Sequence, residues 1–281
     1  MLFTKGHGTG NDFVILPDPD GALDLTPALV AALCDRRRGL GADGVLRVVR
    51  SAKHPDGADF ADDAEWFMDY WNADGSSAEM CGNGVRVFTR YLLTRGLATA
   101  GPEGLPVATR AGVVRAVVSD SLISVHMTTP RVYAASIATI GPLTMPGVAV
   151  DCGNPHLVTG LHDGVDLATL DLTVAPGHDT GLFPDGVNVE FTIPGDPVTG
   201  ADLHVHMRVY ERGSAETLSC GSGALAVGAV ALRDAGLATG MVAVDVPGGR
   251  LLVTADEHGR WFLAGPAVLV ATGEIDVAAL S

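Results

Sequence analysis

The chain has 281 residues, of which 47% are hydrophobic, and a formal net charge of −15. This length allows one large domain or two of about 140 residues each, with ample apolar content for a buried core. Nucleic acids and anionic membranes are excluded as partners, because both require a basic surface. The balance is typical of a cytoplasmic enzyme that acts on a small molecule.

Targeting segments and metal motifs are not evident in the sequence. The N-terminal residues lack the apolar core of a signal peptide, and no apolar stretch reaches the roughly 18 residues of a membrane span. The four cysteines are too few and too scattered for a disulfide scaffold, and no C-x-x-C pair is present. We therefore expect free thiols in a reducing compartment and no bound metal.

Three segments are predicted to be helices. The first begins at the N-cap Thr26, has Pro27 at its first position and continues to Gly39. The second runs from about Gly84 to Arg95, and the third from Ser222 to Gly236.

The remainder of the chain predicts short strands and turns. Residues 202–210 alternate with a period of two, as in a half-buried strand, and residues 247–249 and 257–259 are typical of hairpin turns. Many strands around few helices indicate a mixed α/β (α+β) fold, in which twisted or closed antiparallel sheets have a helix inside or beside them.

A cysteine motif occurs twice, with its two cysteines 139 positions apart. Residues 79–86 read E-M-C-G-N-G-V-R and residues 218–225 read L-S-C-G-S-G-A-L, each followed by apolar residues at helical spacing. A helix start presents free backbone N–H groups and a positive dipole end to the residue before it. A thiol in this position can have its pKa lowered from about 8.5 to roughly 3.5–7.5, which makes it a usable base.

The repeat extends beyond the cysteines. Trp71–Gly75 and Tyr210–Ser214 each end a predicted strand about ten residues before their cysteine, and Gly10-Asn11 is echoed by Gly153-Asn154. Repeats at such similar offsets indicate two homologous halves that meet at a cleft.

The boundary between the two halves is expected near residues 118–120. The first half would comprise residues 1–118 and 266–281, since the apolar tail after Gly265 is expected to return to it as a strand. The second half would comprise residues 119–265.

Two thiols at helix starts suit the inversion of a carbon stereocentre. A thiolate can remove a proton from one face of a planar carbanion while a thiol delivers one to the other face. The backbone N–H groups of residues 82–84 and 221–223 are suited to hold the anionic carboxylate of such a substrate.

Several segments together resemble the diaminopimelate epimerase family. They occur in that family's order and cover the chain from end to end: H-G-T-G-N-D-F (7–13), N-A-D-G-S (72–76), M-C-G-N-G-V-R (80–86), G-N-P-H (153–156), N-V-E-F (188–191) and E-R-G-S-A-E-T-L-S-C-G-S-G-A (211–224). The resemblance implies a cofactor-free epimerase that interconverts LL- and meso-diaminopimelate for lysine and peptidoglycan synthesis. It also implies two pseudo-symmetric halves, each a mainly antiparallel strand barrel around a central helix, in a homodimer.

The resemblance also implies roles for individual residues. Cys81 and Cys220 correspond to the two catalytic acid/bases. The residues that correspond to the grip on the substrate's unreacting centre are Asn11, Asn72, Asn154, Asn188, Glu211 and Arg212. The donors to the carboxylate at the reacting centre correspond to Gly82, Asn83, Gly221 and Ser222. One position departs from the family, since Gly44 stands where many members carry a glutamine that contacts substrate.

Other reactive side chains are given structural roles. Cys34 and Cys152 are expected to be buried and structural, with a place in the lining of the site left open for Cys152 by the neighbouring G-N-P-H segment. His7 and His156 are predicted to hydrogen-bond the backbone in tight turns, with a positioning role left open by the neighbouring asparagines.

A histidine pair on the predicted strand at 202–210 allows two interpretations, a metal site or a solvated strand face. His204 and His206 alternate and so share one face, and such a pair can bind a metal. A third ligand at suitable sequence spacing is not evident, so a solvated strand face is favoured.

Three other functions remain possible from the residues. A proline or hydroxyproline epimerase would use the same two thiols but would have no use for the Asn/Glu/Arg set. A thiol-dependent hydrolase or acyl transferase, with His7 or His156 as its base, needs only one cysteine. A non-catalytic amino-acid-binding protein would need no helix-end thiols.

Overall fold

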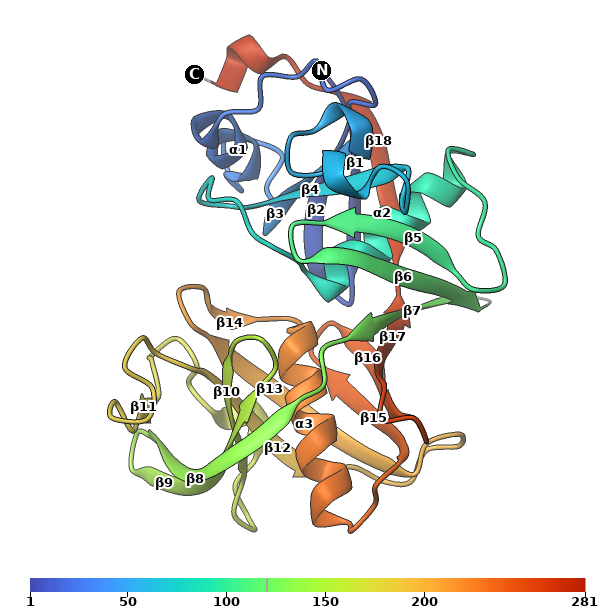
Figure 1. Ribbon diagram of the computed structural model, residues 1–281. Coiled ribbons are helices and arrows are strands. Elements are labelled where there is room, and N and C mark those ends of the chain that lie inside the picture. The colour runs from blue at the N-terminus through green and yellow to red at the C-terminus, as the bar shows by residue number, and fades with distance from the viewer. Residues whose placement is uncertain (120, 281) are drawn as a thin grey trace. The chain divides into compact units, whose positions relative to one another are not determined.

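The computed structural model describes residues 1–119 and 121–280, and it divides into two compact units. Unit 1 comprises Met1–Val125 and Gly265–Ser281, and unit 2 comprises His126–Ala264. Each unit is a layer of strands with one long helix (Figure 1). The mixed α/β fold class predicted from the sequence is confirmed.

Unit 1 is built from strands at both ends of the sequence. In chain order these are β1 (Leu2–Gly8), β2 (Asn11–Pro17), β3 (Gly44–Arg50), β4 (Trp66–Asn72), β5 (Leu105–Thr109), β6 (Gly112–Ser119), β7 (Leu122–Met127) and β18 (Val268–Glu274). β18 pairs antiparallel with β1, so the C-terminal segment returns to the first half as the apolar tail predicted. Most pairs are antiparallel, but β2 lies parallel to β3, and β4 to β5.

Unit 2 is built from a continuous stretch of chain. Its strands are β8 (Arg131–Ile140), β9 (Leu143–Asp151), β10 (Pro155–Gly160), β11 (Gly177–His178), β12 (Asn188–Pro194), β13 (Leu203–Glu211), β14 (Ala215–Thr217), β15 (Gly240–Val246), β16 (Gly249–Ala255) and β17 (Trp261–Pro266). The pairs are again mainly antiparallel, with β10 parallel to β12 and β13 parallel to β15. Both predicted hairpin turns are confirmed, since they connect β15 to β16 and β16 to β17.

The two units share one internal strand order. In unit 1 the pairing runs β18-β1-β2-β3-β4-β5-β6, and in unit 2 it runs β8-β9-β10-β12-β13-β15-β16. The parallel pairs fall at the same two places, and the long helix follows the fifth strand of each order. This correspondence supports two repeated halves.

A helix lies against the strands of each unit and is buried on most of its sides. In α2 (Gly82–Thr94) ten residues are buried, and in α3 (Gly221–Asp234) ten residues are buried as well. A helix that is buried all round belongs to the centre of its unit. The central helices predicted from the sequence are therefore confirmed, and each begins immediately after a motif cysteine.

The first predicted helix is shorter than expected. α1 (Pro27–Cys34) is capped by Thr26 and has Pro27 at its start, as predicted, but it ends before Asp35 instead of continuing to Gly39. The Asp35 carboxylate accepts hydrogen bonds from the backbone N–H groups of Arg37 and Arg38, each at 2.8 Å. These bonds form a local turn that competes with continuation of the helix.

A buried carboxylate organises the strands of unit 1. Asp69 on β4 has no exposed surface and lies between two arginines, with Arg110 Nη2 at 2.6 Å from Oδ1 and Arg47 Nη1 at 3.6 Å from Oδ2. Burial raises the pKa of Asp69, but its hydrogen bonds, that of His54 first, and the Arg110 charge lower it below the ordinary value. Arg110 also donates to the carbonyl oxygens of Tyr70 and Ala78, so the network fixes the loop that leads to Cys81.

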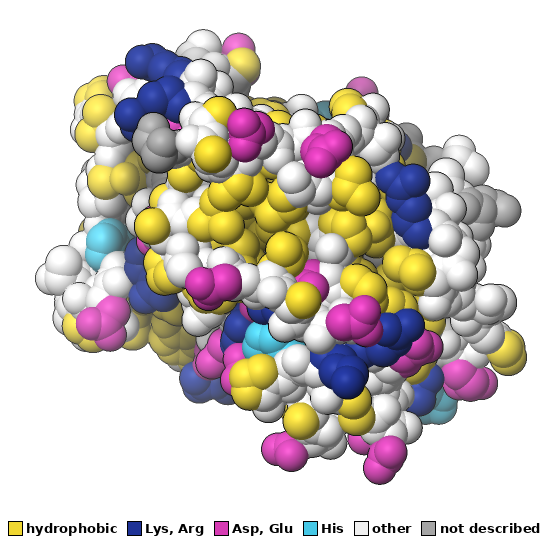
Figure 2. Space-filling view, turned by 90° about the horizontal axis from the view of Figure 1, so that it is seen from above, with side chains coloured by type: hydrophobic (Ala, Val, Ile, Leu, Met, Phe, Trp, Pro, Cys, Tyr) yellow, Lys and Arg dark blue, Asp and Glu magenta, His cyan; other side chains and the backbone are white. Residues whose placement is uncertain are grey.

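The surface includes apolar side chains gathered on one face, as Figure 2 shows. Leu2, Val268 and Val270, on β1 and β18, are among the exposed apolar residues of unit 1. The homodimer implied by the family resemblance stays a prediction. In the part of the chain that the structure describes, no helix has the length and apolar character needed to span a membrane.

The Asp69 network generates a test of stability. Asp69→Asn should lower the free energy of unfolding by about 3–5 kcal/mol, because buried arginine charge loses its counter-ion. Since the folded-state pKa of Asp69 is lowered, its contribution is present above the ordinary carboxyl pKa and is lost as the pH falls through the folded-state value. Denaturant unfolding of both proteins at neutral and acidic pH should show the difference shrinking in acid.

The control for this test is Asp62→Asn, which changes an exposed aspartate of the same unit. It should alter the free energy of unfolding by no more than about 0.5 kcal/mol. Equal losses in the two variants would show that the Asp69 network does not hold the fold together.

Candidate active site

Cys81 is the N-cap of α2. Its backbone is extended (φ −141°, ψ 118°), and its sulfur accepts a hydrogen bond from the Gly84 N–H at 3.4 Å. The N–H groups of a first helical turn have no partner within the helix, so a cap side chain that accepts from one of them is stabilised there. The sulfur therefore lies at the positive end of the helix dipole, as the sequence predicted.

Asn11 lies beside this sulfur. The Asn11 Oδ1 atom is 3.7 Å from Cys81 Sγ and accepts a hydrogen bond from Asn83 Nδ2 at 3.2 Å. The Asn11 amide nitrogen donates to Asp43 Oδ2 at 2.8 Å, which fixes the orientation of the amide. Three of the sequence-predicted residues, Asn11, Cys81 and Asn83, are thus brought together in unit 1.

Asn72 is at the end of β4 and is held by its neighbours. Its Oδ1 accepts from the Tyr70 hydroxyl at 2.9 Å, and its Nδ2 donates to Ser76 Oγ at 3.0 Å. Gly44 pairs with Asn72 across the strands, and a Cβ at Gly44 would lie 2.5 Å from the Trp71 carbonyl oxygen. The backbone leaves no room for a side chain here, which is a physical reason for glycine where the family often has glutamine.

A buried arginine also lies on the helix that follows Cys81. Arg86, on α2, has no exposed surface, and burial lowers its pKa to about 10. Its Nη2 donates to Thr9 Oγ1 at 3.2 Å, while Nε and Nη1 have no hydrogen-bond partner among the described residues. Coulombic attraction to a Cys81 thiolate raises the Arg86 pKa and so offsets part of the effect of burial. The guanidinium is therefore a positive charge placed to favour ionised Cys81.

Cys220 is the N-cap of α3 in the same way. Its backbone is extended (φ −117°, ψ 117°), its sulfur accepts from the Gly223 N–H at 3.4 Å, and Ser222 Oγ lies 3.6 Å from it. Cys220 differs from Cys81 in being buried, with 5% of its surface exposed. Burial, and then the carboxylates of Glu211 and Glu190, raise the pKa of Cys220 well above its ordinary value.

The raised pKa of Cys220 differs from the expectation that a helix start would lower the pKa of both thiols. The helix start is present at Cys220, but desolvation and two acidic neighbours outweigh it. The sequence correctly predicted that Cys220 lies at a helix start, but it could not predict that the thiol is buried.

A buried His–Glu pair underlies the start of α3. His156 Nδ1 lies 2.6 Å from Glu190 Oε1, and His156 Nε2 lies 3.0 Å from Asn154 Oδ1. Both His156 and Glu190 have no exposed surface, and burial raises the pKa of Glu190. A Cβ at Gly223 would lie 2.7 Å from Glu190 Oε1, so the second glycine of this C-G-x-G motif makes room for the carboxylate.

His7 and His156 have different outcomes. His7 Nδ1 accepts from the Gly10 N–H at 3.2 Å, which confirms the predicted role in a backbone turn. The turn predicted for His156 is wrong, because this residue lies on β10 and its ring nitrogens contact the side chains of Glu190 and Asn154. The positioning role left open for His156 is the one that the geometry favours.

The remaining predicted residues of unit 2 surround the end of β13. Asn188 Oδ1 accepts from the Arg212 backbone N–H at 2.8 Å, and Arg212 Nη1 donates to the Asp185 carbonyl at 3.2 Å. Glu211 Oε1 accepts a hydrogen bond from the Thr217 hydroxyl. Asn188 is the register partner of His156 across β10 and β12, so the asparagine and the buried pair lie on adjacent strands.

Sequence reasoning missed three residues of these environments: Asp43, Arg86 and Glu190. Arg86 and Glu190 occur inside the family segments M-C-G-N-G-V-R and N-V-E-F. A charged residue amid the apolar positions of a central helix or strand was the available signal. Cys34 and Cys152 are buried, and burial raises the pKa of the Cys34 thiol to about 11 and that of Cys152 further, which supports their structural assignment.

Comparison with known proteins gives one consistent result. The sequence model of the diaminopimelate epimerase family matches residues 3–133 and 148–275. A diaminopimelate epimerase of Streptomyces coelicolor is 52% identical over 99% of this chain and 96% of its own length.

Solved structures with the same fold are more distant in sequence. A Bacillus anthracis phenazine biosynthesis protein of the PhzF family superposes with a TM-score of 0.72 at 18% identity, covering 98% of each chain. A hydroxyproline epimerase from Agrobacterium vitis superposes with a TM-score of 0.66 at 16% identity, covering 98% of this chain and 90% of its own. At such identities the likeness shows the fold alone.

The contact between Gly223 and Glu190 generates a test with a built-in control. Gly223→Ala should lower the free energy of unfolding by about 1–3 kcal/mol, because the new methyl group must displace a buried carboxylate. Gly84→Ala, at the matching position of α2, should have little effect or be mildly stabilising, since its Cβ would meet neighbours at an ordinary 3.4 Å. Thermal melting of both variants compares them, and equal melting temperatures would contradict the crowding at Gly223.

Proposed function

This chain belongs to the diaminopimelate epimerase family, and on that premise we propose that it interconverts LL- and meso-2,6-diaminopimelate by two-base proton transfer at one α-carbon, with no cofactor. The observation that carries the proposal is the cysteine N-cap at the start of each central helix. The product would serve lysine and peptidoglycan synthesis.

Inversion requires two groups that act on opposite faces of the same carbon. One removes the α-proton as a thiolate, and the other delivers a proton as a thiol; the roles reverse with the direction of the reaction. Cys81 and Cys220 have the chemistry for both roles, and the start of a helix is the place where an anionic sulfur is stabilised.

The α-carbon of an amino acid is a weak acid, so the charge that develops on the carboxylate must be stabilised. The backbone N–H groups of Gly82 and Asn83, and those of Gly221 and Ser222, are in the first turns of α2 and α3. N–H groups in a first turn point away from the helix and are suited to an oxyanion.

The other end of the substrate carries a second amino-acid head group that must be held without reacting. Arg212 offers a planar cation for its carboxylate, and Glu211 offers an acceptor for its ammonium. Asn11, Asn72, Asn154 and Asn188 are the amide side chains that the family resemblance places in this grip. Their side chains are already fixed by hydrogen bonds within their own units.

The environments of the two thiols support different resting states. Burial, and then the carboxylates of Glu211 and Glu190, raise the pKa of Cys220 and keep it protonated. A Cys81 thiolate is attracted by the buried Arg86 guanidinium. We infer that the resting enzyme has Cys81 as its base and Cys220 as its acid.

Two alternatives are weaker. A proline or hydroxyproline epimerase would use the same pair of thiols, but 52% identity over almost the whole chain links this protein to a diaminopimelate epimerase instead. A single-cysteine hydrolase leaves the second N-cap cysteine unexplained.

The central test is exchange of the α-proton in D₂O, measured with LL-diaminopimelate and L-proline in parallel. Deuterium should enter diaminopimelate alone. Cys81→Ala and Cys220→Ala should each lower the rate of epimerisation by at least about 10²-fold, the scale of a lost general acid or base. Cys34→Ala, on α1, is the control and should retain activity. Full activity in either catalytic variant would exclude the two-base mechanism.

The assignment of the resting base has its own test. Arg86→Met should move the acidic limb of the pH profile of kcat/KM to higher pH, because loss of the buried positive charge disfavours the thiolate. Arg86→Lys, which keeps a cation, should restore the limb toward its original position. Each pH profile is measured only on protein whose circular dichroism spectrum matches that of the wild type, which excludes unfolded variants. Identical acidic limbs in the wild type and in Arg86→Met would refute the assignment.

A further inference from the structure

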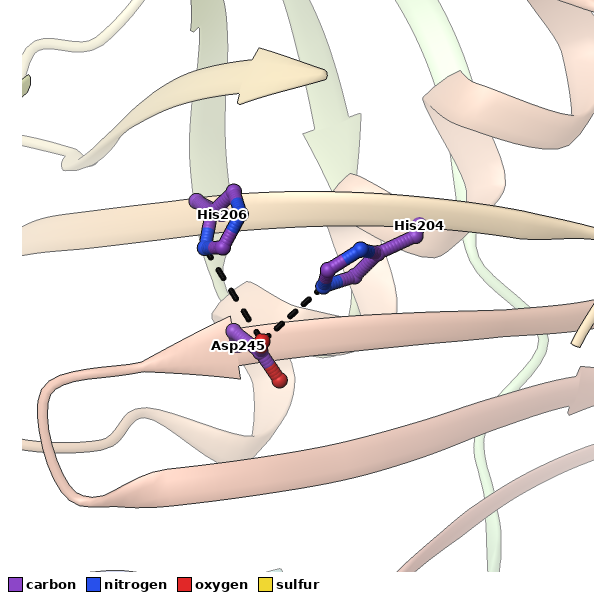
Figure 3. A group of neighbouring side chains, drawn as sticks. All are labelled: His204, His206 and Asp245. Atoms are coloured by element: carbon purple, nitrogen blue, oxygen red, sulfur yellow. Dashed lines mark hydrogen bonds and ion pairs between the residues drawn. The ribbon is translucent and has the colours of Figure 1, made fainter. Parts of the chain in front are cut away.

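A cluster of two histidines and an aspartate lies on the strands of unit 2, at a place that the proposed reaction does not use. His204 and His206 are on β13 and share one face of it, and Asp245 is on the neighbouring parallel strand β15. His206 and Asp245 are register partners. Figure 3 shows both imidazole rings connected to the Asp245 carboxylate.

The three side chains offer one ligand atom each within a small volume. His204 Nε2 is 2.9 Å from Asp245 Oδ2, and His206 Nδ1 is 3.9 Å from the same oxygen. One ligand atom from each of the three residues lies within 4.8 Å of the others. Asp245 is the third ligand that sequence spacing could not supply, because it is 39 positions after His206 and comes close only through strand pairing.

The hydrogen-bond partners of His204 suit a metal cation at this point. Its Nδ1 lies 2.6 Å from the Asp196 carbonyl oxygen, and its Nε2 faces the Asp245 carboxylate. Both of these oxygens are acceptors, whereas a neutral imidazole has only one N–H. The His204 side chain is only 6% exposed, so water has little access to its ring nitrogens. A neutral ring that donates from Nδ1 leaves the Nε2 lone pair facing the carboxylate, and a metal cation would bind both atoms.

The arrangement around His204 is the one found at metal ligands. In such sites one ring nitrogen donates to a backbone carbonyl, which fixes the tautomer and directs the lone pair of the other nitrogen at the metal. The bond from His204 Nδ1 to the Asp196 carbonyl performs that function here.

We propose that His204 Nε2, His206 Nδ1 and Asp245 Oδ2 bind a zinc ion. Two imidazoles and a carboxylate form a donor set that Zn²⁺ accepts, with a fourth position left for water. Ligand atoms at about 2.0–2.1 Å from zinc in a tetrahedral site lie roughly 3.3 Å apart. The two observed distances to Asp245, 2.9 and 3.9 Å, bracket that spacing, and the 41% exposed His206 side chain has the freedom to move inward.

Arg250 limits the affinity of this site. Its Nε and Nη2 atoms hold the two oxygens of Asp245 at 2.6 and 2.7 Å. The guanidinium competes with zinc for Oδ2 and repels it, but 43% of its side chain is exposed and it can retain Oδ1 alone. The site is therefore one of moderate affinity whose strength Arg250 sets.

Binding would join β13 to β15 without involving the cysteines. His206 is five residues before Glu211, which corresponds to roughly 16 Å along an extended strand. Zinc bound here should stabilise unit 2 and leave the resting chemistry of the thiols unchanged. Because free thiols also bind zinc, the test must separate the two kinds of ligand.

The test is calorimetric titration of the whole protein with Zn²⁺, together with the visible spectrum of its Co²⁺ adduct. We expect binding at one site, a higher melting temperature with zinc and a Co²⁺ spectrum without the intense charge-transfer band that thiolate ligands give. His206→Gln should weaken binding at least about tenfold, while His258→Gln, an exposed histidine on a hairpin turn of the same unit, should not change it.

Arg250→Gln supplies the opposite prediction, since removal of the competing cation should tighten zinc binding. Equal affinities in wild type and His206→Gln, weaker binding in Arg250→Gln, or a thiolate band in the Co²⁺ adduct would overturn the proposal.

Discussion

The structure depends on one constraint, the need of a buried helix start for hydrogen-bond acceptors. Each unit wraps strands around a helix whose first N–H groups have no partner within the helix. In both units a cysteine sulfur accepts from the N–H three residues later, at 3.4 Å. The same contact satisfies the helix and places a polarisable, ionisable atom at its positive end. In the proposed reaction one side chain in each unit therefore serves both as helix cap and as acid or base.

The two caps are alike in geometry and unlike in electrostatics. A buried arginine lies in the helix that follows Cys81, and two glutamates influence the pKa of Cys220. A duplicated motif supplies two equivalent sulfurs, and the residues packed beneath them differentiate the pair. The proposed two-base reaction needs such a difference at rest, because two thiols provide no base and two thiolates provide no acid for the opposite face.

Glycine is present at three positions near the cysteines and their strands for different physical reasons. At Gly223 it admits the Glu190 carboxylate, whereas Gly84 has ordinary space around it. At Gly44 the Trp71 carbonyl is too close for any side chain. The glycine at 44 therefore follows from how β3 and β4 pair, and it does not by itself argue against the family's substrate.

The sequence alone predicted the elements and the two cysteines of the proposed chemistry, because both depend on local patterns. Apolar spacing, caps and turn residues predicted the three helices, the strand at 202–210 and both hairpins, and the duplicated C-G-x-G identified Cys81 and Cys220. Only the tertiary structure decided which charges lie near each thiol and that Asp245 joins His204 and His206. Desolvation and Coulombic interactions act through space between segments far apart in the sequence, so no local pattern records them.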